Sequence, residues 1–295
     1  MAESEPTTTE KEGQTQQVQA DEAAEQDDST TQKADESASD KDPGEPFSAI
    51  IEAGTLQDAF NAVAVLVDEC KVHLTPGGWE IRAVDAANVA MVELELPVPA
   101  FESYSGSGGI LGVPLEKFQE AIGMANAGKL IQLAIDPETR KLNIQYEGLD
   151  FNMSLLDPDT IRKEPDKNSL DLNLPATVTL EGDDLTRGKK AADMVADHIR
   201  FTVDDEAQRF RINAQGDTDV VDFELDEDDL ENLNAADASS IFSLDYISDV
   251  IRPIEHDGTV TLMLGNDFPV TIKYTLGEGT VEVRNLIAPR IENDD

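Results

Sequence analysis

The chain has 295 residues, and its 62 acidic residues against 22 basic ones give a formal net charge of −40. Charge of this size and sign excludes a protein that coats nucleic acid or an anionic membrane by bulk electrostatic attraction. The single cysteine, Cys70, excludes an intramolecular disulfide framework and a multi-cysteine metal site. No apolar run reaches the roughly 18 residues of a membrane span, and the amino terminus lacks a secretory signal, so we expect a cytoplasmic protein without membrane contact.

The acidity falls on two kinds of segment. Residues 1–46 contain no Ile, Leu, Phe, Trp or Tyr and carry 14 acidic against 3 basic residues. Such a segment buries too little apolar surface to offset its ordering entropy, so we expect a disordered acidic tail. Residues 47–295 carry 48 acidic against 19 basic residues but have the apolar patterning of a folded protein. For this part, adaptation to concentrated salt, which screens self-repulsion, explains the charge better than disorder does.

From Phe47 onward the chain alternates strand and helix signals. After Gly54, apolar residues at Leu56, Phe60, Val63 and Val67 recur at helical spacing. A second helix is expected from Pro114, because proline is favoured in a first turn. Alternating apolar and polar residues predict strands at 47–51, 71–74, 79–84, 89–96, 130–135, 142–146 and 151–155.

The same pattern then occurs a second time. Adding 129 to a position takes Leu56 to Leu185, and the shift preserves hydrophobic class at many further pairs, such as Val72 with Phe201 and Leu115 with Leu244. A tandem duplication accounts for this match. We therefore predict an α+β protein whose two domains, 47–156 and 171–295, each consist of an antiparallel sheet backed by two helices. Residues 157–170, with two prolines and seven charged residues, are predicted to form an exposed connector.

A catalytic or metal site finds little support in the residue pattern. The three histidines are far apart, and carboxylates are too abundant for one pair to be singled out as acid and base. The run Asp226–Asp229 lacks the glycine that a calcium loop needs at its sixth position. We predict no catalytic residue, no metal and no cofactor, and a binding scaffold rather than an enzyme; a carboxylate-dependent hydrolase is the alternative from another class.

The few basic residues are more informative. Arg187, Lys189 and Lys190 lie within four positions of a predicted helix that starts near Gly182, and Arg252 ends the next predicted helix. At the end of its helix Arg252 complements the helix dipole, whereas bases in the first turns oppose it. The sequence therefore leaves two readings of the first three bases open, ordinary surface residues or a contact with anions.

Several segments in order resemble one family. They are the opening Phe47 with Gly54-Thr55-Leu56, the run from Ile81 to Ala90, the run from Phe268 to Tyr274, and the terminal Leu286-Ile287-Ala288-Pro289-Arg290-Ile291-Glu292. Together with the duplication and the acidic connector, they resemble the proliferating cell nuclear antigen, the sliding DNA clamp of eukaryotes and archaea. The resemblance covers about residues 47 to 295, and the acidity points to a salt-loving archaeal member.

The resemblance implies a homotrimeric ring of two clamp-type domains per chain, with helices lining the hole and sheets outside. Such a ring encircles double-stranded DNA without reading its sequence, is opened by an ATP-driven clamp loader, and serves DNA polymerase as a processivity factor. It also recruits other factors that carry a short apolar and aromatic docking motif. An adaptor or checkpoint ring that has lost its role on DNA is the alternative within this fold.

The resemblance also implies site residues. Bases facing the DNA fall on Arg187, Lys189, Lys190 and Arg252, with Lys117 nearby. Positions where the family usually has lysines are occupied here by Asp58, Ala59, Val65, Glu120 and Gly123. This departure leads us to expect that cations bridge part of the inner face to phosphate. Subunits are expected to pair through strand edges at 149–155 and 220–225. The pocket for partner peptides is implied at Val84, Asn88, Val89, Ile161, Phe268, Pro269, Leu286, Ile287, Ala288 and Pro289.

Overall fold

The computed structural model of the chain describes residues 47–106, 108–136, 138–167 and 171–291. The tail expected at 1–46 lies outside the described residues. The described part contains four α-helices, α1 (Ala53–Ala64), α2 (Leu115–Gly123), α3 (Gly182–Ala192) and α4 (Leu244–Ile251). None of its helices is both long enough and apolar enough to cross a bilayer. The rest is mostly antiparallel strand, in agreement with the predicted α+β class.

The strands form three sheets. Short 3-10 turns at Val98–Ala100, Pro158–Thr160 and Glu227–Asp229 punctuate them. The five-stranded sheet has the order β5 (Phe101–Ser105), β1 (Ser48–Glu52), β7 (Leu130–Asp136), β8 (Lys141–Tyr146) and β9 (Leu149–Ser154). The four-stranded sheet has the order β13 (Val220–Asp226), β12 (Arg209–Gln215), β11 (His198–Asp204) and β15 (Ala238–Ser243). The nine-stranded sheet has the order β14 (Asn232–Asn234), β10 (Ala176–Glu181), β16 (Thr259–Leu264), β17 (Val270–Leu276), β18 (Val281–Ile287), β4 (Ala90–Pro97), β3 (Gly78–Val84), β2 (Glu69–Thr75) and β6 (Ile110–Pro114).

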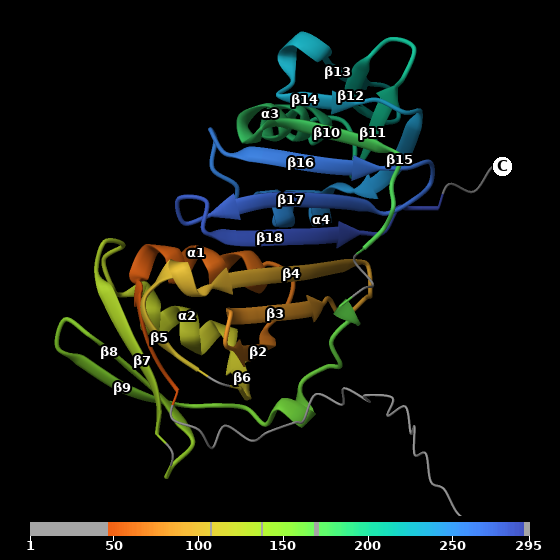
Figure 1. Cartoon of the computed structure of the whole chain (residues 1–295). Coiled ribbons are helices and arrows are strands. Elements are labelled where there is room, and N and C mark those ends of the chain that lie inside the picture. The colour runs from red at the N-terminus through yellow and green to blue at the C-terminus, as the bar shows by residue number, and fades with distance from the viewer. Residues whose placement is uncertain (1–46, 107, 137, 168–170, 292–295) are drawn as a thin grey trace, which may run out of the picture. The chain divides into compact units, whose positions relative to one another are not determined.

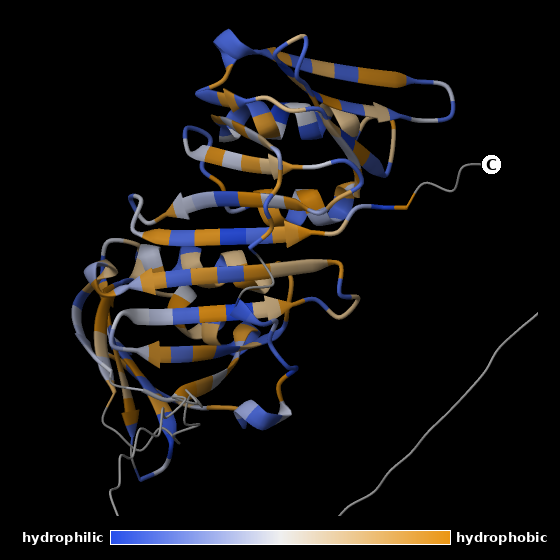
Figure 2. Ribbon diagram, turned by 45° about the vertical axis from the view of Figure 1, so that its right-hand side comes forward, coloured by the Kyte–Doolittle hydropathy of each residue, from blue (hydrophilic) through white to orange (hydrophobic). Residues whose placement is uncertain are grey.

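All four helices lie on one face of the nine-stranded sheet (Figure 1). Along the strands, apolar and polar residues alternate, as the banding in Figure 2 shows, so one face of each strand is buried. Of the apolar set predicted for the first helix, Leu56, Phe60 and Val63 are buried to within 1 % of full burial, whereas Val67 lies beyond the helix end at Ala64. The core therefore lies between the helix pairs and the sheets, and the connector covers part of the other face of the large sheet.

The internal repeat is confirmed by the positions of the elements. Strand β11 is β2 displaced by 129 positions (69 + 129 = 198), and α3 begins where the same shift places the start of α1 (53 + 129 = 182). Both helices bond their first amide to a loop: Ala53 N donates to Lys129 O at 2.7 Å and Gly182 N to Gly258 O at 2.8 Å. A side chain at 182 would bring Cβ to 2.3 Å from the Glu255 carbonyl oxygen, so this approach requires glycine.

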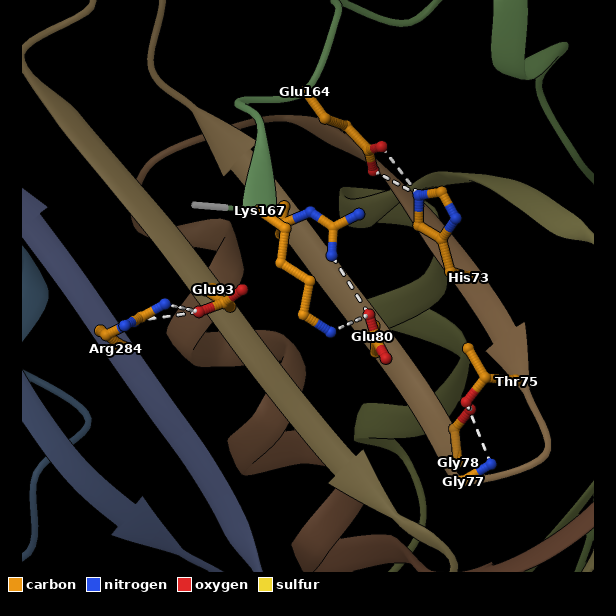
Figure 3. A network of polar contacts seen from close by, with 10 residues as sticks. His73, Thr75, Gly77, Gly78, Glu80, Glu93, Glu164, Lys167 and Arg284 are labelled. Carbon is orange, nitrogen blue, oxygen red and sulfur yellow. Dashed lines mark hydrogen bonds and ion pairs between the residues drawn. The ribbon is translucent and has the colours of Figure 1, made fainter. Parts of the chain in front are cut away.

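The two halves of the chain are joined by one strand pair, which the sequence pattern did not reveal. Strand β18 of the second half runs antiparallel to β4 of the first, and Arg284 stands directly opposite Glu93. The Arg284 guanidinium donates to the Glu93 carboxylate through Nε at 2.9 Å and also through Nη2 (Figure 3). Its Nη1 donates to Asp171 at 2.6 Å. Because only 8 % of Glu93 is exposed, this carboxylate depends on the arginine for its charge partner.

We predict that Arg284→Ala lowers the free energy of unfolding by about 3 kcal/mol, near the low end for a broken buried ion pair. The loss arises because Glu93 would stay buried without a cation. Denaturant unfolding at constant high salt measures it. Arg290→Ala removes the exposed pair with Asp197 (3.1 Å) and is the control, with an expected loss of less than about 1 kcal/mol. Equal losses in the two variants would contradict the assignment.

Candidate functional site

The structure brings three of the expected DNA-facing bases together on the helices of the second half. Lys189 and Lys190 of α3 and Arg252 at the end of α4 line one open hollow of about 310 Å³ together with His256. Arg187 lies about one turn earlier on α3, where its guanidinium stands 5.3 Å from the centre of the Phe223 ring. Arg187, Lys189, Lys190 and Arg252 thus all lie on the helix pair of the second half.

Lys117, the remaining expected base, lies on α2 in the first half. Its ammonium stands 5.8 Å from the centre of the Phe151 ring of β9. This geometry repeats that of Arg187 over Phe223, because both aromatic rings belong to strands at the end of a sheet. Each base is held by the ring face, a contact of about 0.5–1 kcal/mol at exposed sites.

Three of these bases share their charge with an acid on the same helix. Arg187 pairs with Asp184 at 2.8 Å, Lys189 pairs with Asp193 at 3.6 Å, and the Arg252 guanidinium bonds the Asp249 carboxylate. The spacings are three or four residues, which places both partners on one helix face. The surface is therefore mixed in charge, with a much weaker positive potential than its bases alone would produce.

One sequence expectation about α3 was wrong. From the sequence, Lys189 and Lys190 are expected in the early turns of the helix, where the helix dipole disfavours a positive charge. The helix ends at Ala192, so both lysines lie in its last turn, where the dipole favours a positive charge. Favourable interaction with the helix dipole therefore explains the positions of these two lysines as well as that of Arg252.

The first-half helices show where the expected bases are missing. Asp58 is an exposed residue of α1. Partial burial of its carboxyl raises the pKa of that group, and the negative charge of Glu255 raises it further. Glu120 and Gly123 are exposed on α2. Ala59 is fully buried and Val65 follows the helix end. Of the DNA-facing bases expected from the sequence, α1 and α2 thus carry Lys117.

On the opposite face of the large sheet, strand register assembles an apolar row. Leu286 of β18 stands opposite Met91 of β4, which stands opposite Val84 of β3. Val84 and Ile161 line the same groove of about 290 Å³, beside the connector. Ile161 is 6 % exposed, so this apolar residue of the connector packs onto the sheet rather than projecting from it.

The other expected groove residues lie at the end of the same strands. Ala288 N donates to Val89 O at 2.8 Å, and both residues are half-buried. Phe268 is 55 % exposed beside the half-buried Pro269, and Pro289 is also half-buried. Ile287 differs from the expectation, because its side chain is fully buried in the core and cannot contribute to a surface.

The loop that borders this groove is organised by Asp85, which the sequence analysis did not single out. Its carboxylate accepts from the amides of Ala87, Val89 and Ala90 at 2.7–2.9 Å. It also accepts at 2.7 Å from the hydroxyl of Tyr246, which lies on α4 in the other half. Burial raises the pKa of Asp85, but these hydrogen bonds outweigh it and hold that pKa below its usual range, while the bond to Asp85 raises the pKa of Tyr246 to about 12.

Polar contacts fasten the connector across the sheet beside this loop. Arg162 donates to Asn88 Oδ1 at 2.6 Å and to Ala86 O at 3.0 Å. Further along, His73 of β2 contacts Glu164 at 2.8 Å, and Lys167 bonds Glu80 at 3.2 Å (Figure 3). The groove therefore has a charged border on the connector side and an apolar floor.

Within the described ranges, no group of three or more His, Cys, Asp or Glu side chains is placed to hold a metal ion. Asp226 and Asp229, which start and end the acidic run, form a capping box around the turn Glu227–Asp229. Cys70 is buried, and burial raises the pKa of its thiol, so it lacks the thiolate character of a nucleophile.

A duplicated unit of antiparallel sheet and paired helices, with bases on the helix face and an apolar groove on the sheet face, defines a clamp-type binding scaffold. The family description "Proliferating cell nuclear antigen, N-terminal domain" matches residues 48–154. Sequences named DNA polymerase sliding clamp from Natronomonas pharaonis and Halobacterium salinarum are each 49 % identical over 248 residues, which is 84 % of this chain and all of theirs. The A. fulgidus PCNA solved with the C-terminal region of FEN-1 superposes with a TM-score of 0.79 at 30 % identity, covering 84 % of this chain and all of that one. The chain belongs to the proliferating cell nuclear antigen family, the DNA polymerase sliding clamps of DNA replication.

We predict that Asp85→Ala lowers the free energy of unfolding by about 1–3 kcal/mol, because it leaves buried donors without an acceptor. Tyr246→Phe removes one of these bonds and is expected to cost less. Urea unfolding at constant high salt measures both effects. Asp257→Ala, in an exposed turn, is the control and should be close to neutral. A loss for Asp85→Ala no larger than this control would show that the loop does not depend on the carboxylate.

Proposed function

We propose that three copies of this chain close into a ring around double-stranded DNA and tether DNA polymerase and other replication and repair factors. In this role the protein is a processivity factor that acts by topology, without a catalytic step, in the cytoplasm. The observation that carries the proposal is the placement of all four helices on one face of the large sheet (Figure 1), with an open strand edge at the end of each smaller sheet.

Ring closure follows from these edges. Strand β9 ends the five-stranded sheet and β13 ends the four-stranded sheet, and exposed edges offer unpaired backbone groups to another chain. Pairing β9 of one copy with β13 of the next would repeat the way β18 and β4 already join the halves. Since each copy has one edge of each kind, this contact is head-to-tail and generates a closed ring when the rotation matches.

The mixed charge of the helix face fits a protein that encloses DNA rather than gripping it. Arg187, Lys189, Lys190, Arg252 and Lys117 supply the direct contacts with phosphate. Because acids on the same helices offset several of these charges, few counterions are released on binding, and affinity falls only shallowly with salt. Solution cations complete the neutralisation where Asp58 and Glu120 face the duplex.

The apolar groove is the docking site for partner proteins. The apolar row of Val84, Met91 and Leu286, together with Ile161 in the groove beside it and the exposed Phe268, suits a short helical plug with apolar and aromatic anchors. The A. fulgidus relative, solved with a bound C-terminal region of FEN-1, supports this class of partner. An ATP-driven clamp loader is expected to open the ring and to use the same face.

A second candidate is a ring of the same fold that serves only as an adaptor or checkpoint platform. The acids that neutralise Arg187, Lys189 and Arg252, together with Asp58 on α1, favour it, because they weaken contact with DNA. The groove would be used in the same way in both cases, so retention on DNA is the property that separates the two.

We predict that the protein, loaded by the clamp loader of a halophilic archaeon onto a nicked circular duplex at high salt, stays bound until the circle is cut. Linearisation lets a ring slide off, so at least tenfold less protein should remain on linear DNA. Gel filtration of the circular and linear samples measures the bound fraction. A trimer that is never retained would support the adaptor ring, and a monomer at high salt would contradict both candidates.

We predict that Phe268→Ala weakens binding of a FEN-1 C-terminal peptide by at least tenfold, because it removes an exposed aromatic ring from the edge of the groove. Calorimetry or fluorescence anisotropy at constant salt measures the affinity. Met194→Ala is the matched control, since Met194 is an 80 % exposed apolar side chain away from the groove. If both variants bind as the parent does, Phe268 is not part of the peptide site.

A further inference from the structure

The internal junction between the halves is a template for the junction between subunits, and it specifies a register. On either side of the β18–β4 pair, the large sheet consists of five strands from the second half (β14, β10, β16, β17, β18) and four from the first (β4, β3, β2, β6). The two smaller sheets have the complementary composition, five strands ending at β9 and four ending at β13. Joining β9 to β13 would therefore rebuild a nine-stranded sheet of the same kind.

The residue equivalences follow from the paired strands. In the four-stranded parts, Val72, Ile81 and Leu94 stand opposite one another, and Phe201, Ile212 and Phe223 form the same row in the repeat. Leu94 therefore corresponds to Phe223. In the five-stranded parts, Leu133, Ile144 and Phe151 correspond to Leu262, Ile272 and Asn285.

The internal register then transfers to the edges. Asn285 stands opposite Val92, Arg284 opposite Glu93 and Val283 opposite Leu94. Replacing each residue by its equivalent places Phe151 opposite Val221, Asp150 opposite Asp222 and Leu149 opposite Phe223. The half-buried residues of β9 and β13 then share one face, and the exposed carboxylates share the other.

We propose that β13 of a second copy of this chain pairs with β9 in this register, so that Asp150 and Asp222 face each other across the subunit junction. This inference rests on the proposed ring and adds its register and its charge. Two carboxylates occupy the place that the arginine and the glutamate of the internal ion pair hold. The subunit junction is therefore the weak joint of the ring, and it closes only when salt screens it.

Residues on the strands that flank each junction increase the difference in charge between the internal junction and the subunit junction. Across the internal junction the opposed residues are Lys273, Arg284, Glu93 and Arg82, three cations and one anion. The equivalent row across the subunit junction is Gln145, Asp150, Asp222 and Asn213, two anions and no cation. Nearby Glu224 is already paired with Arg209 and Arg211, so those arginines do not neutralise the two aspartates.

The length scales explain why salt decides the outcome. Directly opposed residues on neighbouring strands have Cβ atoms about 5 Å apart. The Debye length is about 10 Å at 0.1 M salt and about 3 Å at 1 M salt. Repulsion between the carboxylates thus acts at full range in dilute salt and is screened in concentrated salt.

The other face of the same junction supplies the attraction. Leu149 and Phe151 of β9 and Phe223 of β13 are half-buried in the single chain, and pairing would cover them. Lys117 over Phe151 and Arg187 over Phe223 would then flank the junction on the helix side. The subunit junction therefore has apolar side chains and bases on its helix side and facing acids on its other side. The internal junction has the opposite charge arrangement: its ion pair lies on the outer side, and on the helix side Asp58 and Tyr246 stand at the positions equivalent to Arg187 and Lys117.

The charge is tested by measuring the KCl concentration at which the full-length trimer dissociates, by sedimentation velocity. Asp150→Arg should restore an ion pair with Asp222 and lower this midpoint at least threefold. The double variant Asp150→Arg with Asp222→Arg should return the midpoint close to that of the parent, because like charges face each other again. Glu102→Arg, exposed on β5 at the far end of the same sheet, is the matched control for net charge. An effect of Asp150→Arg equal to that of the control would overturn the proposal.

The register is tested independently by disulfide formation at high salt. Asn152→Cys with Val220→Cys places cysteines directly opposite each other in the proposed register and should give covalent rings under oxidation. Ser154→Cys with Val220→Cys is shifted by two residues and should cross-link at least tenfold more slowly; the native Cys70 is buried. Faster cross-linking of the shifted pair in an intact trimer would overturn the register and leave the clamp standing. Absence of any trimer at high salt would instead contradict the proposed function.

Discussion

The antiparallel pairing of β18 with β4 is the constraint on which the rest of the structure depends. It joins residues near the end of the chain to residues in its first third, and thereby merges strands of both halves into one sheet. Because the two halves are copies, joining them edge to edge brings both helix pairs to the same face. The same pairing opposes Leu286 to Met91, so the apolar row on the sheet face is completed across the seam. Backbone hydrogen bonding, which is independent of side chains, thus determines where the apolar row and the helix face lie.

Charge is distributed to suit an acidic protein in concentrated salt. Arg284 is one of few cations and stands where a buried carboxylate needs it. Several other arginines and lysines pair with acids at the surface, Arg187 and Lys189 with neighbours along the same helix and Arg209 with Glu224 of the adjacent strand. Stability therefore comes from the apolar core and the sheet ladders, because surface pairs contribute little when screened. A clamp can accept this arrangement, since encirclement needs no strong attraction.

Periodicity in the sequence predicted the elements and the duplication, because burial on one face gives a repeat that a single strand or helix reveals alone. Leu56, Phe60 and Val63 show this for α1, which buries all three. The same periodicity does not predict which elements are neighbours in space. Nothing in the alternation of β4 or β18 names the other as its partner, and Tyr246 lies 161 positions from the Asp85 that it bonds. The expectation for Lys189 and Lys190 was wrong because the sequence has no strong stop signal at Ala192. The expectation for Ile287 was wrong because the alternation along its strand places this side chain on the buried face.

The hydrogen bond between Tyr246 and Asp85 has a mechanical consequence. Its donor belongs to a helix on one face of the sheet, and its acceptor organises the loop that borders the groove on the other face. The two faces are thereby tied by one direct side-chain hydrogen bond between the halves. A displacement of that loop would therefore act on α4 through this bond.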